Sequence, residues 1–204
     1  MHLVRSAMYG YSKLRKRLFT VLMKSQFREI GVGTRIEPPF RGGKLEQVSL
    51  GEHVIINRDC WIQVFADGTN SGSGELVIKS HSAIGMGATI SAALRVTIGE
   101  YVLFARNVYV SDHGHAYLHI NDPIMRQGIT CPMPVSIGDR SWLGQNVCVL
   151  PGASIGKHCV IGANSVVTST IPDFSVAVGV PARVIKQYNK ITEQWENVRN
   201  TSLV

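Results

Sequence analysis

A six-residue hydrophobic period is the strongest pattern in this chain of 204 residues. From residue 137 onward, branched aliphatic side chains recur at every sixth position: Ile137, Leu143, Val149, Ile155, Ile161 and Val167. A small or short residue follows five of these six. Period six fits neither an amphipathic helix, with its 3.6-residue repeat, nor a simple alternating strand. It indicates a short strand followed by a turn, three times in each coil of eighteen residues.

The same period occurs earlier in the chain. Three shorter sets share it: Leu50, Ile56 and Ile62; Ile78, Ile84 and Ile90; Ile98, Phe104 and Val110. The hexads together predict five coils, at 50–67, 78–95, 98–115, 137–154 and 155–172. Each aliphatic should point inward and stack on its equivalent in the next coil, about 4.8 Å away. The sequence therefore predicts an all-β protein whose residues 31–183 form a parallel β-helix.

Four segments depart from the period. Residues 66–75 and 114–134 interrupt the coils, and a loop as long as the second is usually functional. Residues 1–30 carry apolar side chains at three- and four-residue intervals, which predicts one or two amphipathic helices. These helices either pack on the open end of the β-helix or, being basic, place residues 1–28 on an anionic membrane. Residues 184–204 are predicted to form a short C-terminal helix and a tail.

Charge and cysteine content narrow the functional classes. The net charge is +7, which favours an anionic partner such as a phosphate, a nucleotide or an anionic membrane. No CxxC pair occurs among the four cysteines, which argues against a zinc knuckle or a thioredoxin-type site. Neither a secretory signal nor a membrane-spanning apolar run is evident. We therefore expect a cytoplasmic protein, either free or peripheral at the inner face of the membrane, with no nucleic-acid partner.

Two segments carry a resemblance to a known family. SIGDRSWLGQNVCVLPGASIGKHCVIGANSVVTSTIP and VGVPARVIK resemble the hexapeptide-repeat acyltransferases, in particular galactoside- and maltose-type acetyltransferases and polysaccharide O-acetyltransferases. The resemblance implies a left-handed β-helix, acetyl-CoA as co-substrate and a homotrimer with its sites between adjacent chains. It also implies O-acetylation of a saccharide, on a sugar hydroxyl of a capsule, exopolysaccharide or lipopolysaccharide or of its precursor. Gly85 stands where galactoside-type enzymes carry an asparagine near the acceptor, so simple galactosides are not the expected acceptors.

The stretch SDHGHAYLH, residues 111–119, contains the candidate general base. A sugar hydroxyl is a poor nucleophile, and histidine can take its proton at neutral pH. Aligned without gaps, the resemblance places His115 on the catalytic position. His113 lies two residues away, shares a strand face with His115 and is the alternative base. Asp112 would orient one of them, although strand alternation favours the opposite face for its side chain.

The resemblance also implicates residues in coenzyme binding. Trp142 and Gln145 match positions beside the pantetheine arm. Ala163, Thr168 and Ser169 match positions that line the same groove, and Ser169 replaces a lysine that many relatives carry. Arg183 and Lys186 match basic residues that meet the nucleotide phosphates, which suits their chemistry.

Three other functions remain open from the sequence. The first is N-acetylation of an amino-sugar nucleotide, with the same fold, base and coenzyme. The second is a zinc enzyme similar to the gamma-type carbonic anhydrases, in which His113 and His115 would bind zinc with His81 or His119. The third is a non-catalytic scaffold. We expect no metal, because a zinc site would leave the coenzyme-site sequence and the long loop unexplained.

Overall fold

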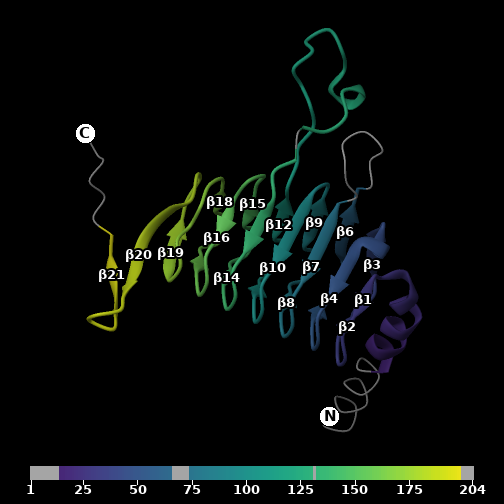
Figure 1. The fold of residues 1–204 in the computed structure, drawn as a ribbon, viewed down its shortest axis with the longest axis horizontal. Coiled ribbons are helices and arrows are strands. Elements are labelled where there is room, and N and C mark those ends of the chain that lie inside the picture. The colour runs from purple at the N-terminus through teal and green to yellow at the C-terminus, as the bar shows by residue number, and fades with distance from the viewer. Residues whose placement is uncertain (1–13, 66–73, 131, 199–204) are drawn as a thin grey trace, which may run out of the picture.

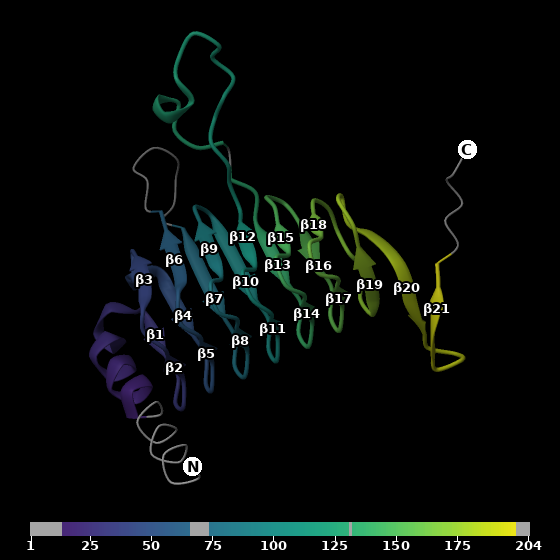
Figure 2. The ribbon, with the colours of Figure 1, turned by 180° about the vertical axis from the view of Figure 1, so that it is seen from behind.

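The chain folds as a left-handed parallel β-helix in the computed structural model, which describes residues 14–65, 74–130 and 132–198. Six coils of three short strands wind around one axis and form a prism with three sheets as its sides (Figures 1 and 2). A helix lies at one end of the prism and a β-hairpin at the other, while one long loop projects from an edge.

The strands of each sheet follow one another along the prism axis. Sheet A contains β1 (Glu29–Ile30), β4 (Val48–Leu50), β7 (Glu75–Ile78), β10 (Arg95–Ile98), β13 (Val135–Ile137) and β16 (Ser154–Ile155). Sheet B contains β2 (Arg35–Ile36), β5 (Ile55–Ile56), β8 (Ala83–Ile84), β11 (Leu103–Phe104), β14 (Trp142–Leu143), β17 (Val160–Ile161), β19 (Ser175–Val178), β20 (Arg183–Asn189) and β21 (Gln194–Asn197). Sheet C contains β3 (Phe40–Gly43), β6 (Cys60–Val64), β9 (Thr89–Ala92), β12 (Tyr109–Ser111), β15 (Cys148–Val149) and β18 (Val166–Val167).

Helical segments are few among the residues that the structure describes. Residues 14–23 form an α-helix that continues into the 3-10 turn η1 (Lys24–Gln26). Two further 3-10 turns are η2 (Leu45–Gln47), before β4, and η3 (Ile124–Arg126), in the long loop. Within the described ranges, no helix is both long enough and apolar enough to cross a membrane.

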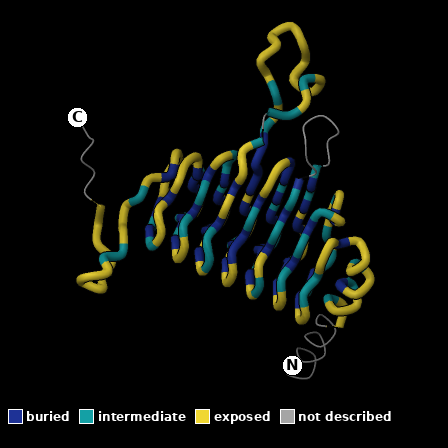
Figure 3. The backbone as a smooth tube through the Cα atoms, in the orientation of Figure 1, coloured by how far each residue is buried: buried dark blue, intermediate teal, exposed yellow. Residues whose placement is uncertain are grey.

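The hexad aliphatics form the core, as the period predicted. In sheet A the parallel register stacks one inward residue of each coil on the next: Leu50, Ile78, Ile98, Ile137 and Ile155. All five are fully buried, and Figure 3 shows this buried band running through the prism. Sheets B and C repeat the arrangement, so each coil buries three aliphatic side chains against its neighbours and excludes water from the interior.

A first coil, formed by β1, β2 and β3, precedes the five that the hexads predict. Two features explain why the six-residue period is not visible in the sequence of this coil. The Pro38–Pro39 pair interrupts the spacing, and Gly42 takes the inward position that Ile62 holds in the next coil. Leu45 from η2 fills the space that the missing Gly42 side chain leaves. The β-helix therefore begins at residue 29, which shortens the predicted helical segment 1–30.

The helix over residues 14–23 closes the N-terminal end of the prism. Phe19 and Met23 pack against the buried core. The Ile36 N–H, on the outermost strand of sheet B, donates to Thr20 Oγ1 at 2.8 Å. The interpretation that this segment packs on the open end of the β-helix is therefore confirmed for residues 14–23. Residues 1–13, which carry the rest of the predicted amphipathic pattern, lie outside the described residues.

The predicted C-terminal helix in 184–204 is wrong. β20 pairs antiparallel with β19, and β21 pairs antiparallel with β20, so the described part of this segment is a β-hairpin. The last coil would otherwise expose the backbone groups of β19, and β20 satisfies them. The β-branched and aromatic residues Val184, Ile185 and Tyr188 favour a strand here. Tyr188 and Trp195 make an edge-to-face ring contact across the hairpin at 5.6 Å.

Candidate active site

Two insertions leave the prism at the edge where sheet C turns into sheet A. One follows β6 and the other follows β12, and the chain re-enters the prism at β7 and β13, respectively. Figures 1 and 2 both show the long loop rising from this edge. The connection between them, from β9 to β10, consists of only Ala93 and Leu94. A short turn thus lies between two long excursions, and the stretch SDHGHAYLH begins directly beside it.

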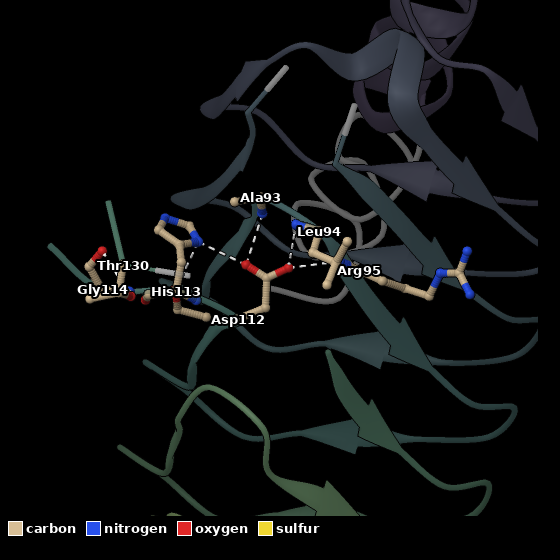
Figure 4. A network of polar contacts seen from close by, with 8 residues as sticks. Ala93, Leu94, Arg95, Asp112, His113, Gly114 and Thr130 are labelled. Atoms are coloured by element: carbon tan, nitrogen blue, oxygen red, sulfur yellow. Dashed lines mark hydrogen bonds and ion pairs between the residues drawn. The ribbon is translucent and has the colours of Figure 1, made fainter. Parts of the chain in front are cut away.

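The short turn wraps the carboxylate of Asp112. The Ala93 N–H donates to Oδ1 at 2.8 Å, and the N–H groups of Leu94 and Arg95 donate to Oδ2 at 2.8 and 2.7 Å, respectively (Figure 4). The Asp112 side chain is fully buried. A buried charge needs such partners, because an unpaired carboxylate would cost several kcal/mol.

His113 completes the arrangement. Its Nδ1 lies 2.8 Å from Asp112 Oδ1, and its side chain is 9% exposed. The Ser111 hydroxyl donates to the His113 carbonyl at 2.8 Å, which holds the backbone as it leaves β12. The ring of Phe65, at the base of the first insertion, meets the imidazole edge-to-face at 5.0 Å. These contacts fix His113 beside Phe65, at the point where the chain leaves β12 for the long loop.

The protonation state of Asp112 sets the tautomer of His113. Burial alone would raise the pKa of Asp112, but the hydrogen bonds from His113 and the three backbone N–H groups outweigh it, and the pKa lies below its ordinary value. The carboxylate is therefore ionised at neutral pH and can only accept, so Nδ1 must carry a proton. Within the described residues the hydrogen bonds of the ring involve Nδ1, which leaves Nε2 as a proton acceptor.

His115 lies in a different environment. It is exposed on the stem of the long loop, where its backbone forms an antiparallel bridge with Ile129. The Thr130 N–H donates to the Gly114 carbonyl at 2.8 Å and closes the same stem. His119 is exposed farther along the loop, where its N–H donates to Gln127 Oε1. Of the three histidines in this stretch, His113 is the one that the structure pairs with a carboxylate.

The expectation that alternation separates Asp112 from the histidines is wrong. β12 ends at Ser111, so the two-residue alternation of a strand no longer governs the side chains that follow. The contributions of Ser111, Phe65 and the turn at residues 93–95 were not predicted. The sequence offers one signal for them. The hexads that form β9 and β10 are joined by a short connection, and an acidic residue, Asp112, follows the hexad of β12.

The zinc arrangement considered from the sequence is not formed among the described residues, where no group of histidine, cysteine or acidic side chains is placed to hold a metal. His81 lies at the edge between sheets A and B. Its ring stacks on those of His53 and Tyr101, at 5.2 and 4.6 Å between centroids. The edge that carries SDHGHAYLH is a different edge of the prism, so His81 and His113 do not meet.

The residues implicated in coenzyme binding are all exposed, but they lie on different parts of the prism. Trp142 projects from the outer face of sheet B. Gln145 and Ala163 occupy successive turns between sheets B and C, where the Asn164 N–H donates to the Gln145 carbonyl at 2.8 Å. Thr168 and Ser169 follow β18, at the edge that carries the two insertions. Within one chain these positions flank sheet C and do not form a single closed cavity.

Arg183 and Lys186 both lie on β20, beyond the last full coil. Their register partners on β19 are Val178 and Val176, respectively. Both cationic side chains are exposed at this end of the prism. Lys186 makes no ion pair within the described part of the chain, and the Arg183 guanidinium donates to the Ala182 carbonyl. Both charges are thus available to an anionic ligand.

Comparisons with known proteins agree with this fold. Residues 134–169 match the family model described as bacterial transferase hexapeptide (six repeats). The chain is 40% identical over 131 residues to a protein of Escherichia coli (strain K12) named as the lipopolysaccharide biosynthesis O-acetyl transferase WbbJ, covering 61% of this chain and 67% of that protein. It is 33% identical over 168 residues to the galactoside O-acetyltransferase of the same strain, covering 82% of this chain and 68% of that protein.

A solved structure shares the fold across most of the chain. The N-acyltransferase AntD from Bacillus cereus, in complex with dTDP and 3-hydroxybutyryl-CoA, superposes with a TM-score of 0.69 at 21% identity, covering 84% of this chain and 89% of that one. The two O-acetyltransferase relatives, the hexapeptide model and the coils of the prism all agree. The chain belongs to the hexapeptide-repeat acyltransferase family.

Proposed function

We propose that this protein is an acetyl-CoA-dependent O-acetyltransferase that modifies a sugar hydroxyl of a surface polysaccharide or of its precursor, with His113 as the general base. One observation carries the choice of base: buried Asp112 holds His113 through Nδ1, and the hydrogen bonds of the ring within the described residues involve that nitrogen and not Nε2. The resemblance favoured His115, but that residue is exposed on the loop stem. The O-acetyltransferase names of the two Escherichia coli relatives support the acceptor class.

The reaction follows from this geometry. His113 Nε2 accepts the proton of the acceptor hydroxyl while the hydroxyl oxygen attacks the acetyl carbonyl carbon. The carbon–oxygen bond forms, the carbon–sulfur bond breaks, and the proton on Nε2 passes to the departing thiolate of coenzyme A. Asp112 acts as a positioning residue, because its negative charge stabilises the imidazolium that forms during the transfer. No covalent enzyme intermediate is needed.

The coenzyme site that we propose uses residues of two chains. Arg183 and Lys186 would meet the phosphates of the coenzyme, and Trp142 would lie along its pantetheine arm. Gln145 and Ala163 on one side of sheet C, and Thr168 and Ser169 on the other, would line a groove only when a second prism packs alongside. This separation supports a homotrimer with each site between adjacent chains.

Paired variants test the base. His113→Gln should lower kcat for acetyl transfer by about a hundredfold to ten-thousandfold, because general-base catalysis contributes that much. The affinity for acetyl-CoA, measured by calorimetric titration, should be unchanged and near one site per chain. His115→Gln, the matched control, should keep kcat within a few-fold. A large loss in His115→Gln with little effect in His113→Gln would return the base to His115.

N-acylation of an amino sugar is the second candidate, because the structural likeness includes an N-acyltransferase crystallised with a nucleotide. The acceptor product distinguishes the two reactions. An O-acetyl ester is cleaved by alkaline hydroxylamine, whereas an N-acetyl amide is not. We expect the acetylated product to lose its acetyl group on this treatment. A hydroxylamine-stable product made only from amino-sugar acceptors would establish N-acylation instead.

A further inference from the structure

The helix over residues 14–23 is apolar on two opposite sides. One side faces the prism and places Phe19 and Met23 on the core. On the other side, aliphatic residues at positions i, i+4, i+7 and i+8 form a continuous stripe, since 3.6 residues complete a turn. This outer stripe consists of Leu14, Leu18, Val21 and Leu22, which are 66%, 58%, 69% and 67% exposed, respectively. Packing onto the β-helix therefore does not explain the outer stripe.

Cations border the outer stripe. Arg15 and Lys16 both reach Glu37, with N–O distances of 3.8 and 2.8 Å, so their charge is partly balanced within the chain. Arg17, on the helix, and Lys24, in η1, make no ion pair within the described residues and are exposed. The chain as a whole carries a net charge of +7. An apolar stripe with unbalanced positive charge beside it complements a surface in which an anionic layer covers an apolar layer.

We propose that the outer stripe docks this protein on an anionic membrane surface, with the helix lying in the plane of the interface. The four aliphatic side chains would enter the boundary between headgroups and acyl chains, and Arg17 and Lys24 would meet anionic headgroups. The inner side of the helix is fixed to the rigid β-helix through Phe19, Met23 and Thr20. The outer stripe therefore lies on the side of the helix that is opposite the prism, and Figure 1 shows the helix at the end of the molecule.

This orientation sets the height of the candidate site above the membrane. Asp112 and His113 leave β12 in the fourth coil, three coils from the end that carries the helix. At one strand spacing per coil, the site lies about 14 Å beyond the first coil, and the helix lies between that coil and the membrane. A saccharide attached to a lipid could reach His113 at that height. This consequence rests on the proposed function, whereas the docking itself does not.

Vesicle co-sedimentation of the full chain tests the docking. The protein should pellet with vesicles of phosphatidylcholine mixed with phosphatidylglycerol, and much less with phosphatidylcholine alone. Leu18→Gln/Leu22→Gln should lower the partition coefficient at least tenfold, because two exposed leucines no longer enter the interface. Arg17→Gln/Lys24→Gln should lower it about fivefold per charge removed and weaken its dependence on salt.

The matched control is Leu118→Gln/Ile191→Gln, which removes two aliphatic side chains that are 82% and 94% exposed elsewhere in the chain. This variant should bind vesicles as the unchanged protein does. Equal pelleting of Leu18→Gln/Leu22→Gln and the unchanged protein would overturn the proposal. The proposal would also be overturned if the unchanged protein does not bind vesicles and Leu18→Gln/Leu22→Gln has a smaller mass than the unchanged protein in light scattering. The stripe would then join two copies of the chain. Calorimetric titration of acetyl-CoA tests the proposed function separately from the docking.

Discussion

Asp112 holds a negative charge that is fully buried and stabilised by four hydrogen-bond donors. Three are backbone N–H groups of residues 93–95, and the fourth is His113 Nδ1. Such charge-assisted hydrogen bonds are stronger than neutral ones. The same carboxylate thus contributes to the stability of the fold and to the position of the proposed base.

Asp112→Asn separates these two contributions. The asparagine amide has one acceptor oxygen, and its NH₂ would face donors, so we expect the free energy of unfolding at pH 7 to fall by about 2–3 kcal/mol. The folded-state pKa of Asp112 is lowered, so its stabilisation is present above the pKa of the unfolded chain and is lost as the pH falls through the folded value. The gap between the two proteins in urea unfolding should therefore be widest near neutral pH and shrink below about pH 4. kcat should fall at least a hundredfold with acetyl-CoA affinity unchanged.

Asp122→Asn is the matched control for this change. Asp122 is exposed in the long loop, and its backbone carbonyl, not its carboxylate, accepts from Gln127. The variant should match the unchanged protein in stability at every pH and in kcat. If Asp112→Asn shows a stability gap that does not vary with pH, the buried charge does not provide the stabilisation described here.

The residues of this site could be predicted only in part. The histidine-rich stretch stands out in the sequence, and the resemblance directed attention to His115 and His113. The backbone partners of Asp112 could not be predicted in the same way, because they are N–H groups of the turn between β9 and β10, which the stacking of successive coils brings alongside. The pattern of side-chain types along a sequence does not predict which backbone N–H groups a turn leaves without a backbone partner.

At the scale of the coils, Gly85 shows how closely successive turns are stacked. A Cβ built on this residue would lie 1.8 Å from the Ala105 carbonyl oxygen of the next coil. The contact is with backbone, which cannot move aside as a flexible side chain does. Any side chain at this position would meet that backbone oxygen.

Gly85→Ala should therefore destabilise the protein. Separating the two turns would strain the ladder of the third and fourth coils, and we expect a loss of about 2–3 kcal/mol. For a chain of this length, thermal unfolding should shift down by about 5–10 °C. Gly114→Ala is the control, because its added Cβ would meet Thr130 Oγ1 at an ordinary 3.8 Å. Equal melting temperatures for the two variants would contradict the close stacking.

The strands could be predicted from the sequence where the period of the side chains alone determines the structure. Every predicted hexad set from residue 50 to residue 172 lies on the strands of its coil, because each aliphatic has one place inside the prism. The first coil was missed because Leu45, from outside the period, fills the place of a side chain at Gly42. The C-terminal helix was wrong because β19 offers a strand edge, and local sequence does not show that edge.

On the scale of the whole molecule, the outward face of sheet B is more apolar than that of sheet A. From β5 to β17, the outward residues of sheet B that stand in register along the axis are apolar: Ile55, Ala83, Leu103, Trp142 and Val160. Arg35 precedes them on β2. The equivalent residues of sheet A include Ser49, Thr97, Ser136 and Ser154, which are polar. Among the exposed large apolar side chains are Ile55, Leu103 and Trp142. A continuous apolar face of this length is typical of a protein–protein contact.

We expect this face of sheet B to lie in the contact between chains of the proposed trimer. The unchanged protein should then show a mass of about 67 kDa in light scattering, three times the 22.4 kDa of one chain. Leu103→Glu places a charge in the middle of the face, where the side chain is 50% exposed and the fold of one chain does not depend on it. The variant should dissociate to single chains and lose acetyl transfer, because Trp142 and Gln145 would no longer face a second prism.

Ser136→Glu places the same charge on the outward face of sheet A, also at an exposed position. It should leave both the mass and the transfer rate unchanged, so a loss specific to Leu103→Glu identifies the face and not the added charge. A mass of one chain for the unchanged protein would rule out the trimer. A variant Leu103→Glu that remains trimeric would move the contact to another face. In the expected case, loss of transfer together with loss of assembly would explain why the coenzyme-site residues are spread over different edges of one prism: each site requires the edges of two chains.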